Sequence, residues 1–111
     1  MTTKIASVQR GIIFLMAEWS GNAHLAYGQL TRLLEERHLP SDHLICIDVD
    51  REREVYNLPE FAGKIHGNGE AAVVKTGRIV FVTSLGKDKR QIRERCEELL
   101  KFYDVAGGAA P

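Results

Sequence analysis

Two side chains in the tract Ala-Glu-Trp-Ser-Gly-Asn-Ala-His, residues 17–24, have types and spacing that could support nucleophilic catalysis. Ser20 carries a hydroxyl, and His24 follows about one helical turn later if the segment is helical. A hydrolytic serine also needs an acid that orients the histidine and donors that stabilise an oxyanion, and the neighbouring sequence indicates neither. We therefore interpret Ser20 as the N-cap of a helix and His24 as an exposed side chain.

The two cysteines, Cys46 and Cys96, are the other candidate nucleophiles, and they lie far apart in the chain. They fit no metal-ligand spacing. Both have apolar neighbours, which favours buried, unreactive thiols over a disulfide and predicts a cytoplasmic protein. The alternative, catalysis through one of these thiols, requires that it be accessible and reactive.

Other polar clusters are weaker candidates for chemistry. His38 and His43 lie in a polar loop, but a metal site there would need further ligands. The carboxylates of residues 48–54 alternate with arginines that neutralise them. The run 87–90, Lys-Asp-Lys-Arg, could bind phosphate but is interpreted as the solvated start of a helix, and the glycine-rich turn 67–69 precedes no helix. The sequence therefore predicts no metal and no cofactor.

Length and composition describe one globular domain, because the chain has 111 residues, of which 44% are apolar and 27% charged. Fifteen basic and fifteen acidic side chains cancel, so no net positive field attracts nucleic acid or anionic lipid. No apolar run approaches the ~20 residues of a membrane span, and residues 1–4 lead into no signal-peptide segment. We expect one domain over residues 1–106, a disordered tail over 107–111, and neither nucleic acid nor a membrane as partner.

Hydrophobic patterning predicts alternating strands and helices. Residues 11–17 are apolar on both faces, as in a strand covered on each side. A helix from Ser20 to about His38 ends before Pro40. Its expected inward stripe consists of Ala23, Ala26, Leu30, Leu33, Leu34 and Arg37.

The remaining elements complete the fold prediction. They are a strand at 44–49, a mixed segment at 51–65 with a short helix interrupted at Pro59, a hairpin of strands 71–75 and 78–83, and a helix at about 87–103. The inward side chains expected on this last helix are Ile92, Cys96, Leu99, Leu100 and Tyr103. A right-handed crossover makes the first two strands parallel, and the hairpin adds antiparallel pairing. The order predicts an α/β fold with a central mixed sheet of four to five strands and helices on both faces.

The tract A-E-W-S-G-N-A at 17–23 resembles the active-site turn of thioredoxin, where a buried strand runs into A-E-W-C-G-P-C-K and a long helix follows. The hairpin V-V-K-T-G-R-I-V at 73–80 resembles the family's L-F-K-N-G-x-x-V, and Asp50 matches the aspartate that closes the second strand. The resemblance covers roughly residues 11–100. It implies a thioredoxin-like fold with a shortened N-terminal region in residues 1–10.

The resemblance also implies that the thiol chemistry of this family is lost. Ser20 and Ala23 stand where the two cysteines would be, so no mixed disulfide can form there. Phe14 falls at the family's buried aspartate, Cys46 near its companion lysine, and Gly69 at its cis-proline. We therefore predict a redox-inactive member of this family without dithiol oxidoreductase activity.

A binding surface is the remaining implication of the resemblance. In active relatives an extended peptide lies between the strand-to-helix turn and the loop before the hairpin. The corresponding positions here are Trp19, Ser20, Gly21, Asn22, Ala23, Gly69 and Glu70. An exposed indole beside small residues suits peptide contact, although the indole could instead pack on its own domain. We expect a non-catalytic protein-interaction or chaperone/assembly module with a polypeptide partner. That partner could also be a second copy of this chain, which would make the protein a homo-oligomer. The alternative is a small-molecule binding protein of the glutathione-binding kind, or an enzyme, on the same fold.

Overall fold

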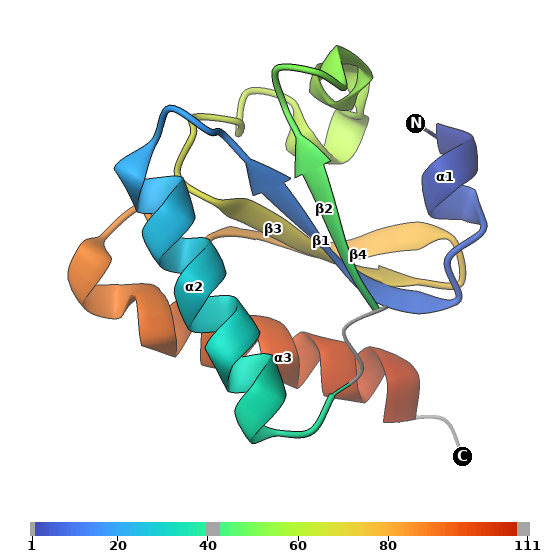
Figure 1. Cartoon of the computed structure of the whole chain (residues 1–111). Coiled ribbons are helices and arrows are strands. Elements are labelled where there is room, and N and C mark those ends of the chain that lie inside the picture. The colour runs from blue at the N-terminus through green and yellow to red at the C-terminus, as the bar shows by residue number, and fades with distance from the viewer. Residues whose placement is uncertain (1, 40–42, 109–111) are drawn as a thin grey trace.

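The computed structural model describes residues 2–39 and 43–108 (Figure 1). Its elements are α1 (Thr2–Ala6), β1 (Arg10–Met16), α2 (Gly21–Glu36), β2 (Leu44–Asp48), the 3₁₀ helices η2 (Arg53–Asn57) and η3 (Pro59–Phe61), β3 (Glu70–Lys75), β4 (Arg78–Ser84), the 3₁₀ helix η4 (Lys89–Gln91) and α3 (Ile92–Gly108). The helix α3 extends beyond the predicted end near Tyr103. Residues 107 and 108 of the expected tail therefore belong to α3, and 109–111 lie outside the described residues.

The four strands form one mixed sheet in the order β2-β1-β3-β4. Strands β1 and β2 are parallel, whereas β1 with β3 and β3 with β4 are antiparallel. This arrangement confirms the predicted α/β class and mixed sheet. The sheet has four strands because the N-terminal segment forms the short helix α1, which leaves β2 at one edge and β4 at the other.

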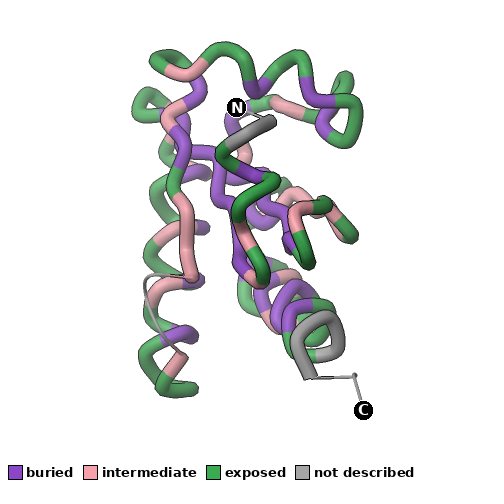
Figure 2. Tube along the Cα trace, turned by 90° about the vertical axis from the view of Figure 1, so that its right-hand side faces the viewer, coloured by how far each residue is buried: buried purple, intermediate pink, exposed green. Residues whose placement is uncertain are grey.

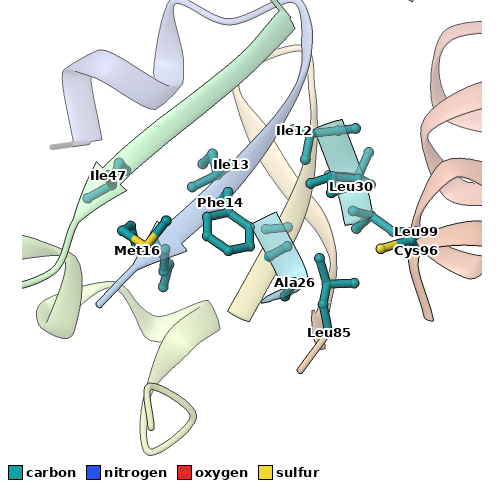
Figure 3. Packing of buried hydrophobic residues seen from close by; sticks show 14 of the residues in the cluster. Ile12, Ile13, Phe14, Met16, Ala26, Leu30, Ile47, Leu85, Cys96 and Leu99 are labelled. Atoms are coloured by element: carbon teal, nitrogen blue, oxygen red, sulfur yellow. The ribbon is translucent and has the colours of Figure 1, made fainter. Parts of the chain in front are cut away.

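Two layers cover the sheet. Helices α2 and α3 lie side by side on one face, and α1 with the η2–η3 segment lies on the other (Figure 1). On the face of α2 and α3, Ile12 and Phe14 of β1 pack toward Ala26 and Leu30 of α2 and Leu99 of α3 (Figure 3). Every residue of β1 after Arg10 is buried, as a central strand covered on both faces requires.

The inward stripes of the two long helices follow the predicted spacing, with one exception. The stripe of α3 is confirmed, because its five predicted members, Ile92, Cys96, Leu99, Leu100 and Tyr103, are all buried. In α2 the alanines and leucines of the stripe are buried, but Arg37 is exposed just beyond the helix end. Its guanidinium instead lies 2.5 Å from the carboxylate of Glu97, and this ion pair joins the two helices. Exposed positions line the outer sides of the helices, and buried positions run through the sheet (Figure 2).

The prediction that both cysteines are buried is wrong for Cys46. Cys96 is fully buried on α3, whereas Cys46 is exposed on β2. The strand register places Cys46 beside Phe14, and Phe14 faces Tyr27 of α2 with 5.2 Å between the ring centroids. Cys46 therefore lies on the face that carries the long helices. These helices lie mainly over β1 and β3, so a residue on the edge strand β2 stays uncovered.

Candidate functional site

The turn between β1 and α2 is organised by Ser20. Its backbone is extended (φ −104°, ψ 119°), and its Oγ accepts a hydrogen bond from the Ala23 N–H at 3.3 Å. This geometry confirms Ser20 as the N-cap of α2. The same hydroxyl donates to the carbonyl oxygen of Gly67 at 2.5 Å, a contact that the sequence did not indicate. Ser20 thus connects the helix start to the loop before β3.

The loop 67–69 lies directly against this helix start. The side-chain amide of Asn22 donates to Oδ1 of Asn68 at 3.3 Å. Gly67 has φ 74° and lies against the indole of Trp19, since a Cβ at this glycine would be 2.4 Å from the ring. The two segments that the resemblance assigned to one binding site are therefore adjacent in the structure.

Gly69, which the resemblance aligned with the family's cis-proline, has φ 69°. A Cβ at this position would lie 2.8 Å from the Cβ of Ala26 and 3.1 Å from the ring of Phe14. Proline requires a φ near about −65°, and no side chain fits beside that ring. Phe14, itself fully buried, thus fills the space beneath the turn and leaves room only for glycine.

The exposed residues of this turn form a small surface around one large apolar side chain. Trp19 is 68% exposed, although its indole contacts Gly67. The neighbouring positions are small or polar. We define the Trp19 surface as the exposed Trp19 and Gly21 together with the half-buried Ser20, Asn22 and Asn68.

Three predicted members of the binding surface do not belong to it. Ala23 is fully buried because it lies on the inward stripe of α2, and Gly69 is buried against Phe14. Glu70 is only 1% exposed, because it begins β3 and its carboxylate lies beside Ser84 of β4. The Glu70 carboxylate is therefore directed toward β4 rather than exposed at this turn.

Ser20 and His24 do not form a nucleophile and base pair in this structure. Nε2 of His24 lies 2.9 Å from the carbonyl oxygen of Glu18 and 3.6 Å from its carboxylate. The Ser20 hydroxyl instead donates to Gly67. This arrangement agrees with the interpretation of Ser20 as a cap and of His24 as an exposed side chain.

The cysteine thiols are held away from the reactive thiolate form. Burial raises the pKa of Cys96 to about 12. Partial burial, and after it the carboxylates of Glu18, Asp48 and Glu52, raise the pKa of Cys46 above its usual value. Because the thiolate is the nucleophile, neither environment activates a cysteine.

Metal-ligating groups do not gather in the described part of the chain. Within residues 2–39 and 43–108, no three His, Cys, Asp or Glu side chains lie close enough together to hold an ion. His43, considered as a ligand from the sequence, instead hydrogen-bonds through Nδ1 with the hydroxyl of Tyr103. In the same ranges, no helix is long and apolar enough to cross a bilayer.

A polar pocket of about 400 Å³ lies on the other side of the loop before β3 and was not predicted from the sequence. We call it the Glu70 pocket, and it is lined by Gly63, Lys64, His66 and Asn68, by Glu70, by residues 82–84 at the end of β4, and by Lys87 and Arg95. The signal in the sequence was the acidic residue that opens the apolar run Glu-Ala-Ala-Val-Val at 70–74. A carboxylate at the start of a buried strand requires a polar environment.

Comparison with solved structures identifies the architecture, although no family model and no curated protein matches the chain. Mitochondrial thioredoxin 3 from Saccharomyces cerevisiae matches with a TM-score of 0.60 and 16% identity, over 88% of this chain and 86% of that one. The chain has a thioredoxin-like fold. Plasmodium falciparum thioredoxin matches with a TM-score of 0.58 and 20% identity, over 87% and 88% of the two chains.

A thioredoxin from Entamoeba histolytica, solved as a cysteine-to-serine mutant, matches with a TM-score of 0.61 and 16% identity, over 90% of this chain and 87% of that one. These similarities confirm the fold expected from the tract at 17–23 and the hairpin. Identities at this level establish the fold and leave the activity to be argued from the site.

Proposed function

We propose that this chain is a non-catalytic protein-interaction module that binds a polypeptide, in a chaperone or assembly role, through the Trp19 surface. The observation that carries the proposal is the 68% exposure of Trp19. An indole combines a large apolar area with one polar group, and exposed side chains of this kind are enriched among residues that dominate protein interfaces. A partner that covers the indole removes this apolar area from water.

The rigidity of the Trp19 surface supports the same proposal. The Ser20 hydroxyl and the Asn22 amide are both hydrogen-bonded to the loop 67–69, so the turn and the loop form one unit. The indole itself lies against Gly67. A surface that is ordered before binding loses little conformational entropy when the partner docks.

The chemistry of the turn supports a role without thiol exchange. The helix N-terminus, where a thiolate would be stabilised, carries the Ser20 hydroxyl and the Ala23 methyl group. The two thiols of the chain lie elsewhere, and both have raised pKa values. In insulin reduction with dithiothreitol we expect no rate above that of buffer.

Replacement of Trp19 tests the binding surface directly. The experiment captures partners from the same extract on immobilised native protein, Trp19→Ala and Tyr56→Ala. Tyr56→Ala is the control, because Tyr56 is a second exposed aromatic residue that lies on η2, outside the Trp19 surface. We expect native protein and Tyr56→Ala to retain the same polypeptide, and Trp19→Ala to bind it at least about tenfold more weakly, as for an interface hot spot.

The fluorescence of the captured complex provides an independent readout. Trp19 is the one tryptophan of the chain, so its emission reports on this surface alone. Titration with the purified partner, or with a tryptophan-free fragment of it, should shift the emission to shorter wavelength. A partner that Trp19→Ala retains at full strength, or that binds without changing this emission, would show that the surface is not used. Insulin reduction by the native protein would separately contradict the absence of catalysis.

A further inference from the structure

We propose that the Glu70 pocket binds a small zwitterionic molecule that carries an amino group and an anionic carboxylate or phosphate group. The inference is independent of the Trp19 surface, although both sites share the loop before β3. Three observations on the described residues carry it: a buried carboxylate with an unpaired oxygen, a group of cations without ion-pair partners, and a cavity of about 400 Å³ between them. Cavities of this size are typical of small-molecule sites.

The carboxylate of Glu70 is the first observation. Its Oε2 accepts hydrogen bonds from the Asn68 N–H at 3.3 Å and from the Ser84 hydroxyl at 3.1 Å. Its Oε1 is also buried, and no donor among the described residues reaches it. Because an unpaired carboxylate oxygen is costly inside a protein, this atom favours a ligand that brings an N–H group.

The cations at the walls are the second observation. No carboxylate in residues 2–39 and 43–108 lies within ion-pair distance of Lys64 or Lys87. Within the same ranges Arg95 makes one hydrogen bond, a 3.4 Å contact from Nη2 to Gln91, and its Nε is buried without an acceptor.

Three other arginines of the chain differ from this group. Arg37, Arg90 and Arg93 each lie within 3.3 Å of a carboxylate oxygen. The unpaired positive charges of the described residues therefore include a set that gathers around the Glu70 pocket. Such a set attracts an anionic group, and a planar guanidinium suits carboxylate and phosphate oxygens in particular.

The two sets of charges together specify the ligand. A pure anion would meet the cations but would be repelled by Glu70, and a pure cation would have the opposite difficulty. A molecule with both groups, such as an amino acid or a phosphorylated amino acid, pairs its ammonium group with Glu70 and its anionic group with Lys87 and Arg95. The hydroxyl of Ser84, already bonded to Glu70, lies at the same wall.

Titration of the native protein with four probes tests the proposal. Glutamate and phosphoserine carry both charges, whereas glutarate, which is glutamate without its amino group, and inorganic phosphate lack the amino group. We expect backbone amide shifts in nuclear magnetic resonance spectra to change at residues 63–70, 82–87 and 95, and the two zwitterions to bind at least about tenfold more tightly than their amino-free counterparts. The difference between glutamate and phosphoserine then identifies which anionic group is preferred.

Matched variants assign the roles of the charges. Arg95→Gln and Lys87→Gln should weaken zwitterion binding about tenfold, while Lys89→Gln, an exposed lysine two positions from Lys87, should leave it unchanged. Glu70→Gln should abolish the preference for the amino group. If Glu70→Gln fails to fold, the Lys87→Gln and Arg95→Gln variants still test the proposal, because these two side chains are not part of the hydrophobic core.

Three results would overturn the proposal. The first is equal binding of glutarate and glutamate, or of phosphate and phosphoserine, which would make the pocket a simple anion site. The second is a set of shifted amides outside the pocket, or binding that Arg95→Gln does not affect. The third is no binding of either zwitterion up to about 10 mM. Trp19→Ala should bind the zwitterion normally, so failure of this site and failure of the Trp19 surface are distinguishable.

Discussion

At the scale of single residues, Ser20 performs two structural tasks with one hydroxyl. The oxygen accepts from the first turn of α2, and the proton is donated to Gly67. A cysteine thiol is a weak donor and acceptor and would serve both contacts less well. The hydroxyl of Ser20 therefore gives this turn a fixed connection between helix and loop.

The two thiols should differ in accessibility and resemble each other in low reactivity. Because the pKa of Cys46 is raised, its modification by Ellman's reagent should be slow at pH 7 and should accelerate only at a higher pH than for an ordinary thiol. Cys96, with a pKa of about 12 and no exposure, should react only after unfolding in urea. Rapid modification of either thiol in the native protein at pH 7 would contradict the raised pKa values and support a thiol-based activity.

The pKa of Cys96 also has a consequence for stability. Its folded value lies above the usual value of about 8.5, so the unfolded chain loses this proton first as the pH rises. The contribution of the buried thiol to stability is complete below about pH 8.5 and decreases as the pH approaches 12.

At the scale of elements, the turn before β3 depends on the strand and helix beneath it. Gly69→Ala would place a methyl group 2.8 Å from Ala26 and 3.1 Å from the ring of Phe14, in a left-handed backbone conformation. We expect a loss of about 2–5 kcal/mol in the free energy of unfolding, because conformational strain and overpacking add. Urea unfolding followed by circular dichroism measures this loss.

Gly63→Ala is the matched control for that substitution. Gly63 has nearly the same φ, 68°, but a methyl group added there would meet no atom within 4 Å beyond its chain neighbours. Its replacement should cost only the conformational part, about 1–2 kcal/mol. Equal losses for the two variants would mean that Phe14 and Ala26 do not restrict this turn.

The strands and α2 could be predicted from the sequence to within about two residues, whereas α3 is displaced by about five residues at each end. The environment of some side chains could not be predicted. Local spacing specifies the stripes of α2 and α3, because helical periodicity depends on near neighbours in the chain. Glu70 and Cys46 were misplaced for another reason. The burial of Glu70 depends on Ser84 across the hairpin, and the exposure of Cys46 depends on which strand forms the sheet edge.

The same limit applies to the candidate site. The juxtaposition of the turn at 17–23 with the loop 67–69 followed from the resemblance, since both segments are local motifs. The Glu70 pocket did not, because its cations come from positions spread between Lys64 and Arg95. The pairing of charges depends on the tertiary structure. The sequence gives the number of charged residues but does not show which of them form ion pairs.

At the scale of the whole molecule, the layers of the fold differ in the extent of their strand pairing and burial. Strands β1 and β3 each pair on both sides, and their central residues are fully buried. Among the described strands, β2 pairs with β1 alone and has an exposed position at Cys46. The η2–η3 segment, on the face opposite the long helices, is buried mainly through Val55 and Phe61.

This asymmetry predicts an order of local opening. Backbone amides of β1 and β3 should exchange with solvent deuterium at least about tenfold more slowly than those of residues 53–61, because opening a central strand breaks two ladders and exposes the core, whereas the 3₁₀ segment opens alone. Hydrogen exchange followed by mass spectrometry of short peptic fragments measures both sets in one sample. If residues 53–61 exchanged as slowly as β1, the η2–η3 segment would be as stable as the sheet that it covers, and the predicted order of opening would be wrong. The loop 62–69 connects that layer to β3 and borders both proposed binding sites, so ligands at either site should slow its exchange first.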